Sequence, residues 1–224
     1  MEFLETEDGS LTLRHAVLGE LYHSDRGAVG EAEHVYIRAG LDFVAAERAA
    51  AESERPIAVF EVGFGTGLNA WLTAERAAEL GRAVDYRAID LYPLAEETWR
   101  KLHYTESPFF EWMQEVPWDG AAYRYGEGQF SLTKFQADLV TFDFSEMAST
   151  FDVVYFDAFA PDAQPELWSE AVMAAMYRIL RPEGVLVTYS SKGSVKQALR
   201  AVGFEVSRLP GALGKRHMVR ARKI

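Results

Sequence analysis

Cysteine is missing from the sequence, which has 224 residues. Its absence excludes disulfide bridges, thiolate zinc sites and cysteine nucleophiles, and it fits a reducing compartment. Long apolar runs are missing too, so we expect no membrane-spanning segment and no membrane partner. The first ten residues, MEFLETEDGS, lack the basic and apolar regions of a signal peptide. Together these absences predict a cytoplasmic protein.

Positive charge is scarce and unevenly distributed. The sequence has 23 Lys and Arg against 34 Asp and Glu, a net charge of −11 at pH 7. Residues 192–224 hold nine of the basic residues and one acidic residue, a net +8, so residues 1–191 carry −19. The total argues against a nucleic-acid-binding protein, whereas the basic segment can form a nucleic-acid contact surface. A solvated helix face and a basic tail explain the segment equally well.

The apolar content predicts a folded α/β domain. Hydrophobic residues make up 49% of the sequence and aromatic residues 13%, and the length suffices for one domain with a full core. Because we find no internal repeat and no low-complexity linker, we expect a single domain over residues 1–224. Within it, residues 1–55 are expected to form an N-terminal extension that covers part of the sheet or of the site.

The stretch from Ile57 to Asn69, IAVFEVGFGTGLN, organises the rest of the chain. Its apolar start predicts a short buried strand, its glycines a turn, and residues 68–80 a helix. In α/β sheets such a unit holds the nucleotide part of a cofactor beyond the carboxyl end of the strand. The pattern E-x-G-x-G-x-G differs from the dinucleotide fingerprint G-x-G-x-x-G, and no Gly-Lys-Ser/Thr of a phosphate-binding loop follows. A plain tight connection is the structural alternative.

This pattern resembles the first motif of class I S-adenosylmethionine (AdoMet) methyltransferases. AdoMet carries a sulfonium and no pyrophosphate, so its site needs close backbone approach and carboxylates and no phosphate-binding lysine. The resemblance implies a Rossmann-like α/β fold. It has a mostly parallel seven-stranded sheet, helices on both faces and an antiparallel C-terminal strand pair, here residues 204–209 and 217–222. The residues of this stretch expected to bind the cofactor are Glu61, Gly63, Phe64, Gly65, Thr66, Gly67 and Asn69.

Two later aspartates are expected to hold the nucleoside part of AdoMet. Asp90 ends a predicted strand over 84–89, where a carboxylate can accept hydrogen bonds from both ribose hydroxyls. Asp138 follows an alternating strand over 130–136, and there it can accept a hydrogen bond from the adenine amino group. Asp90 can instead serve only as the cap of a helix predicted over 94–101.

A third aspartate, Asp157, ends the predicted buried strand 151–156. This strand is expected beside the first one, which brings Asp157 to the reactive end of the cofactor, in contact with both cofactor and substrate. Two prolines hold the loop that follows, before a helix predicted over 166–180. The next strand, 184–189, ends at Tyr189. An aspartate that only caps the loop is the structural alternative.

The segments flanking these motifs are less regular. Alternating Leu11 and Leu13 predict a short strand, which can pair with residues 35–37. A turn is expected at 25–27 and a helix over 42–52. The candidate active-site groups of this region, each with a structural alternative, are Tyr22, His23, Glu31 and His34. The aromatic-rich segment 104–128 can either stack on a base or fill a satellite core.

Five segments match a narrower pattern in the same order along most of the chain. They are LYHSDRGAVGEAEHVYIRAGL, FDAFAPDAQPELW, YSSKGSVKQAL, GFEV and LPGALGKRHM. The second resembles the D-G/A-F-A-P-x-x-x-P-x-x-W signature of the tRNA wobble-uridine methyltransferases, the MnmC-type family, and the others resemble further elements of that family. Two positions depart from it, because Tyr36 stands where Phe is usual and Ala158 where glycine is frequent.

The resemblance implies methyl transfer from AdoMet to the amine of 5-aminomethyl-(2-thio)uridine in tRNA. Well-known members carry a second, flavin-dependent domain, for which these residues leave no room. We therefore expect no flavin, no metal and a separate enzyme that supplies the free amine. The transfer is a single in-line displacement, so much of its rate comes from holding a neutral amine near the methyl group.

Asp157 or a backbone carbonyl of the loop 158–161 can orient the N–H groups of such an amine, and no covalent nucleophile is needed. The expected catalytic residues are Asp157 and Tyr189. The expected substrate-binding residues are Phe159, Pro161, Lys192, Lys215 and Arg216. Two alternatives stay open: a small-molecule N- or O-methyltransferase, which the charge of −11 favours, and a non-catalytic module that binds AdoMet or tRNA.

Overall fold

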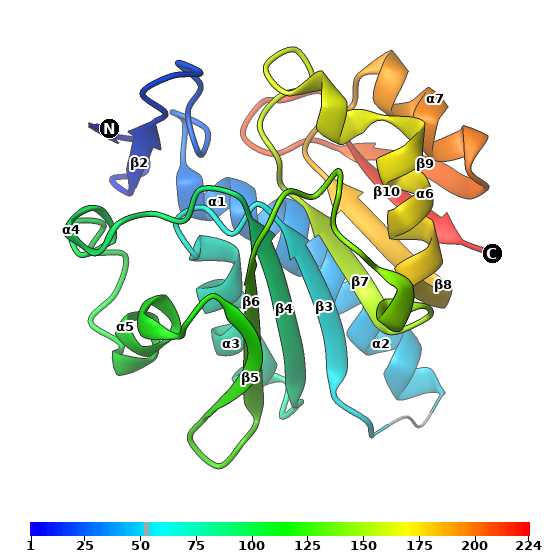
Figure 1. Cartoon of the computed structure of the whole chain (residues 1–224), viewed down its shortest axis with the longest axis horizontal. Coiled ribbons are helices and arrows are strands. Elements are labelled where there is room, and N and C mark those ends of the chain that lie inside the picture. Colours follow the sequence, from blue (N-terminus) through cyan, green and yellow to red (C-terminus); the bar gives the residue numbers. More distant parts are fainter. Residues whose placement is uncertain (52–53) are drawn as a thin grey trace.

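The structure is a computed structural model that describes residues 1–51 and 54–224. Within these residues, eight strands form one mixed sheet (Figure 1). In spatial order the strands are β5 (Asp119–Tyr125), β6 (Phe130–Gln136), β4 (Val84–Asp90), β3 (Ile57–Val62), β7 (Phe151–Phe156), β8 (Leu180–Thr188), β10 (His217–Lys223) and β9 (Phe204–Pro210). The order reverses beside β3, and such a switch point is where open α/β sheets bind ligands.

The sheet confirms the predicted Rossmann-like arrangement and adds one strand to it. Strands β6, β4, β3, β7 and β8 pair in parallel, and the C-terminal pair β9 and β10 is antiparallel, as expected. The additional strand, β5, pairs antiparallel with β6 at the edge of the sheet. The sequence of β5, DGAAYRY, gave no strand signal because its side chains are mostly exposed or half-buried and lack a clear apolar alternation.

Helices cover both faces of the sheet, and each face has its own apolar core. One core lies between the sheet and five helices and includes Val59, Tyr86 and Tyr155. These helices are α1 (Ala28–Ala32), η1 (Glu33–Asp42), α2 (Phe43–Ala50), α3 (Leu68–Glu79) and α5 (Pro108–Glu115). The other core includes Phe60 and Phe156 and packs against α6 (Glu170–Ile179) and α7 (Gly193–Ala201). Neighbouring residues of β3 therefore point to opposite cores, as the strand pleat requires.

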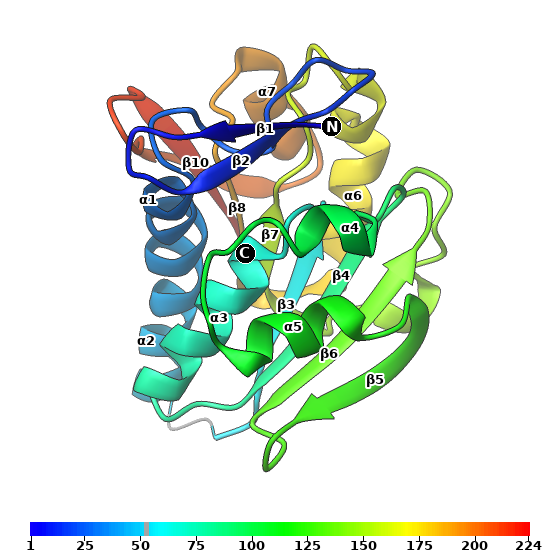
Figure 2. The ribbon, with the colours of Figure 1, turned by 90° about the vertical axis from the view of Figure 1, so that its left-hand side faces the viewer.

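The N-terminal segment differs from the prediction in its strand partner. Strand β2 (Leu11–Arg14) forms as expected, but it pairs with β1 (Glu2–Glu5), and residues 35–37 lie in helix η1. The buried residues of η1 recur at helical spacing along the whole segment. This longer pattern outweighs the short apolar run at 35–37, which taken alone resembles a strand. Figure 2 shows β1 and β2 lying across one end of the sheet. They cover the end at which the parallel strands finish.

Two helices have other boundaries than the sequence predicted. The helix expected over 94–101 shrinks to α4 (Glu96–Trp99). The helix expected over 166–180 divides into a 3-10 turn, η3 (Pro165–Trp168), and α6, because the Ser169 hydroxyl accepts a hydrogen bond from the Val172 amide and starts a new helix. A second 3-10 turn, η2 (Ser145–Met147), precedes β7.

Two further expectations concern residues 25–27 and 42–52. The turn at 25–27 is present. Helix α2 ends at Ala50, and the expected helix end at Glu52 lies outside the described residues. The aromatic side chains of the segment 104–128 pack in or against the sheet core, which favours the core over a base-stacking surface. No helix in the described ranges is long and apolar enough to cross a membrane.

Candidate active site

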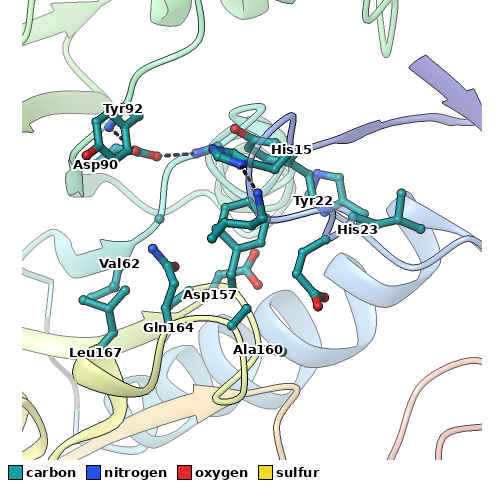
Figure 3. Close-up of a pocket in the computed structure, with 18 of the residues that line it drawn as sticks. His15, Tyr22, His23, Val62, Asp90, Tyr92, Asp157, Ala160, Gln164 and Leu167 are labelled. Atoms are coloured by element: carbon teal, nitrogen blue, oxygen red, sulfur yellow. Dashed lines mark hydrogen bonds between the residues drawn. The ribbon is translucent and has the colours of Figure 1, made fainter. Parts of the chain in front are cut away.

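A cleft of about 1350 Å³ opens at the carboxyl ends of the central strands. Its floor is formed by the ends of β3, β4, β6 and β7, and residues 14–25 of the N-terminal segment form its roof. Figure 3 shows Asp90 and Asp157 from the floor around the same cavity as His15 and Tyr22 from the roof. Residues of the N-terminal segment therefore cover this cleft.

The glycine-rich turn after β3 forms one wall of the cleft. Gly63, Gly65 and Gly67 all have positive φ angles, of 83°, 52° and 78°. A Cβ atom on Gly63 would lie 2.7 Å from the carbonyl oxygen of Asp157, so this turn needs glycine to pass the end of β7. Of the loop residues expected to bind the cofactor, Gly63, Phe64 and Gly65 line the cleft.

The other predicted loop residues lie behind this wall and hold it in place. The Asn69 side-chain amide donates to Glu61 Oε1 at 2.9 Å, and Glu61 is fully buried. Burial raises the pKa of the Glu61 carboxyl well above its usual range. Thr66 Oγ1 shares a hydrogen bond of 2.8 Å with His23 Nε2, and the Thr66 carbonyl accepts from Gln114 Nε2 at 2.7 Å. Gly67 starts α3, and a Cβ there would collide with Gln114.

Two aspartates line the cleft on the β4 and β6 side. Asp90 accepts hydrogen bonds from the amides of Gly65 at 3.0 Å and Tyr92 at 2.9 Å, which ties the glycine turn to the end of β4. Burial raises the pKa of Asp90. Asp138 accepts from the amide of Val140 at 2.9 Å. Exposed Tyr92 and Val140 give this end of the cleft an apolar rim.

Asp157 lies at the end of β7 and is held from two sides. Its Oδ1 accepts a hydrogen bond of 2.5 Å from the Tyr36 hydroxyl, and its Oδ2 accepts one of 2.8 Å from the Asn69 amide. Burial raises the pKa of Asp157 to about 7, although both hydrogen bonds act to lower it. The carboxyl group therefore exchanges its proton near neutral pH. The same Asn69 amide bridges Asp157 to Glu61.

Tyr36 was not among the predicted site residues. The signal in the sequence was its departure from the family pattern, because tyrosine adds a hydroxyl where phenylalanine is usual. Structurally, Tyr36 lies in η1 and is 2% exposed. Its hydroxyl donates a hydrogen bond to Asp157 at the floor of the cleft.

Lys215 turns toward the cleft instead of facing solvent freely. It lies on the turn between β9 and β10, as predicted, but its ammonium donates to Glu31 Oε1 and lies 5.3 Å from the centre of the Tyr189 ring. Glu31 is buried in α1, and its other carboxylate oxygen accepts from the Ser24 amide at 3.1 Å. The Tyr189 hydroxyl donates to the Ala158 carbonyl at 2.9 Å. Glu31, Tyr189 and Lys215 therefore meet beside Asp157.

The remaining predicted residues divide between the cleft and the outer surface. Phe159 lines the cleft and makes edge contacts with His15 and Tyr22, at ring-centre distances of 5.3 and 5.0 Å. Three predicted substrate contacts do not line it. Pro161 lies in the adjoining loop, Lys192 pairs with Asp162 before α7, and Arg216 is exposed on the β9–β10 turn.

The candidate histidines also separate. His23 lines the cleft, and burial lowers the pKa of its ring to about 4, so it is neutral at pH 7. His34 lies on the outer surface, where its Nε2 contacts the Pro210 carbonyl at 2.8 Å. His34 therefore has a structural role, whereas Tyr22, His23 and Glu31 belong to the cleft.

A glycine turn after a strand, acids at the neighbouring strand ends and a cleft between them are typical of a Rossmann-like enzyme that binds a nucleoside-containing cofactor. The family model described as S-adenosyl-L-methionine-dependent methyltransferase matches residues 112–224, half of the chain. The chain belongs to this family and is an AdoMet-dependent methyltransferase. Gly63 and Gly65 line the cleft without a side chain between their backbone and the cavity, which fits the close backbone approach that AdoMet needs.

Individual relatives extend this likeness to nearly the whole chain. The chain is 29% identical to the tRNA 5-methylaminomethyl-2-thiouridine biosynthesis bifunctional protein MnmC of Pseudomonas paraeruginosa, over 91% of this chain and 32% of that protein. It is 30% identical to the protein of the same name from Azoarcus sp., over 96% of this chain and 34% of that protein. The chain thus spans about a third of the length of these curated relatives.

A solved structure agrees with these relatives. MNMC2 from Aquifex aeolicus superposes with a TM-score of 0.78 at 27% identity, over 98% of this chain and 69% of that one. The resemblance inferred from the five sequence segments is therefore confirmed at the level of the family.

Proposed function

We propose that this chain methylates the primary amine of 5-aminomethyl-(2-thio)uridine at the wobble position of tRNA. The observation that carries the proposal is Asp157, a carboxyl group with a pKa of about 7 at the floor of the cleft, with Glu31 and Tyr189 beside it. Carboxylates and an aromatic face suit an amine that arrives as an ammonium ion. The names of the curated relatives support tRNA as the bearer of that amine.

The proposed cofactor site extends across the floor of the cleft. AdoMet supplies an activated methyl group when it is bound. The turn at Gly63 and Gly65 would approach its methionine part, Asp90 would accept from the ribose hydroxyls and Asp138 from the adenine amino group. Glu61 and Asn69 would act from behind, by fixing Asp157 and the turn. In this proposal residues 1–224 are one methyltransferase domain, with residues 1–55 as its N-terminal extension.

The proposed role of Asp157 is to accept a proton from the substrate ammonium and to orient the neutral amine. A positioned acid or base works best when its pKa lies near the operating pH, and the pKa of Asp157 is about 7. Tyr36 and Asn69 fix the direction of its two oxygens. Tyr189 holds the Ala158 carbonyl of the adjoining loop in position. This chemistry requires neither a flavin nor a metal.

The proposed tRNA surface is the outer part of the basic segment. Several of its cations already have partners within the chain: Lys192 pairs with Asp162, Lys215 with Glu31, and Arg222 with Glu47 and Glu183. Among the described residues, Arg220 and Lys223 have no acidic partner within 4.0 Å but donate to the carbonyls of Ala39 and Leu180. Four further cations of this segment have no acidic partner within the described ranges either. They are Lys196, Arg200, Arg208 and Arg216. These four are the proposed contacts to tRNA phosphates.

We also propose that a separate enzyme supplies the aminomethyl group of the substrate.

The test of this function is methyl transfer to a defined tRNA. Purified protein is incubated with AdoMet labelled in its methyl group and with tRNA that carries 5-aminomethyluridine at the wobble position. Nucleoside mass spectrometry should find the label on the amine of that nucleoside, and tRNA with plain uridine should stay unlabelled. Labelling of small amines with no labelling of the tRNA would favour the small-molecule alternative.

Replacing Asp90 with alanine is expected to weaken AdoMet binding by roughly 1.5–3 kcal/mol, the usual worth of a hydrogen bond to a charged group. The variant also frees the amides of Gly65 and Tyr92, which Asp90 holds. Isothermal titration calorimetry measures the effect. The control is Asp143→Ala, which removes an exposed carboxylate from a loop outside the cleft. Equal affinities in the two variants would contradict the ribose assignment.

A further inference from the structure

The ion pair between Glu31 and Lys215 takes no part in the proton transfer proposed for Asp157. It joins residues 184 positions apart in the sequence and lies where the cleft reaches Asp157. The two partners are held very differently. The Glu31 side chain is 11% exposed, lies in α1 and accepts a second hydrogen bond from the Ser24 amide. The Lys215 side chain is 41% exposed and belongs to a surface turn. Glu31 is therefore the fixed partner and Lys215 the exchangeable one.

Lys215 presents a primary ammonium group to this part of the cleft. The ammonium contacts the Glu31 carboxylate and lies over the Tyr189 ring, with 5.3 Å to the ring centre. An anionic oxygen and an aromatic face are the two partners that bind a cationic amine best. The substrate proposed above carries the same group, so the structure contains a pocket for an ammonium ion that is filled by one of the chain's own side chains.

Because the Glu31 carboxylate is buried, replacing Lys215 by another ammonium ion costs less free energy than removing Lys215 without a replacement. Removing the partner of a buried charge leaves that charge uncompensated, which is strongly unfavourable. A second ammonium that enters as Lys215 leaves keeps the Glu31 carboxylate paired throughout. A neutral uridine at the same place cannot compensate the charge. The pocket is thus able to distinguish an aminomethyl base from an unmodified one.

We propose that Glu31 and Tyr189 form the subsite that selects the substrate's ammonium group, and that Lys215 occupies this subsite until tRNA binds. This inference rests on the proposed function, because it takes the substrate to be an aminomethyl nucleotide. It assigns Glu31 a part in specificity, separate from the proton transfer at Asp157. The Lys215 ammonium occupies the place that the substrate ammonium would take. Of the two cations on the β9–β10 turn, Arg216 alone is then proposed to contact a tRNA phosphate.

The experiment compares the binding of two tRNAs that differ only at the wobble base, one with 5-aminomethyluridine and one with uridine. AdoMet is left out, so that no transfer occurs. The wild-type protein should bind the amine-bearing tRNA roughly tenfold more tightly, as one charge-assisted contact implies. Glu31→Gln should remove this preference and leave binding of the uridine tRNA unchanged. Lys215→Met should widen the preference several-fold, since the internal competitor is gone.

The matched control is Glu33→Gln, which removes a carboxylate two residues further along, where it pairs with Arg38 outside the cleft. It should keep the wild-type preference. The inference is overturned if Glu31→Gln still prefers the amine-bearing tRNA, or if Lys215→Met weakens both tRNAs equally and flattens their salt dependence, as loss of a phosphate contact would. Lys215→Met changes a surface turn and so gives an answer even if Glu31→Gln does not fold. A wild-type protein that fails to methylate the tRNA would contradict the proposed function instead.

Discussion

Replacing Asp157 with asparagine is expected to reduce the rate of methyl transfer by roughly 10²–10⁴-fold, the usual contribution of a positioned acid or base. Asparagine has nearly the same shape but cannot take a proton from the substrate ammonium. The neighbours that direct this side chain, Tyr36 and Asn69, stay in place. AdoMet affinity should largely remain, because the turn and Asp90 are unchanged. Single-turnover assays at saturating AdoMet measure the effect.

The same residue predicts the pH dependence of the wild-type enzyme. The pKa of Asp157 is about 7 in the folded protein, and only the ionised form accepts a proton. The single-turnover rate should therefore rise with pH up to about 7 and level off above it. Tyr36→Phe removes a hydrogen bond that lowers this pKa, so the rise should move to higher pH.

Loss of stability is not expected to explain a slow Asp157→Asn variant. Burial raises the pKa of Asp157 above that of an unfolded chain, so the folded state holds this proton more tightly. The stability that this group contributes is present below the unfolded pKa and is lost as pH rises through about 7. At pH 8 asparagine should be at least as stable. The control Asp143→Asn should keep wild-type turnover. If Asp157→Asn also kept wild-type turnover, the role of Asp157 would be structural, as a cap of the loop that follows β7.

Local sequence signals were sufficient to predict the floor of the cleft. Asp90, Asp138 and Asp157 each follow a strand that its apolar pattern reveals, and parallel strands bring their carboxyl ends to one edge of the sheet. The glycine turn needed only its spacing. The placement of these residues at one cleft was predictable because each depends on a segment of fewer than about fifteen residues and on the general rule for where α/β sheets bind ligands.

The contacts that join distant segments could not be predicted in the same way. Tyr36 reaches Asp157 across 121 positions, and Glu31 reaches Lys215 across 184. The periodicity or motif of one segment does not indicate which residue of a distant segment it will contact. The sequence predicted Lys215 as a substrate contact within the basic segment, whereas tertiary packing turns its ammonium toward the buried carboxylate of Glu31. Residues 35–37 are helical for a similar reason, because packing against the sheet outweighs a short apolar pattern.

Gly63→Ala is expected to lower the free energy of unfolding by about 2–5 kcal/mol and to weaken AdoMet binding by at least about tenfold. The φ angle of Gly63 is 83°, which costs an L-residue about 1–2 kcal/mol. Its new methyl group would lie 2.7 Å from the Asp157 carbonyl oxygen. This backbone atom cannot move alone, so the overpacking adds about 1–3 kcal/mol. Any relief moves Asp157 away from the turn and distorts the cleft that both of them line.

Gly9→Ala separates the backbone term from the collision. Gly9 has a φ angle of 79°, and no atom lies within 4 Å of a Cβ built on it. This variant should therefore lose about 1–2 kcal/mol and keep its AdoMet affinity. At Gly65 a Cβ would meet the Tyr22 ring at 3.1 Å, and because a side chain can shift, Gly65→Ala should fall between the two. Urea unfolding and calorimetry measure both quantities. If Gly63→Ala cost no more than Gly9→Ala, close packing between the turn and the end of β7 would not be what holds the cleft in shape.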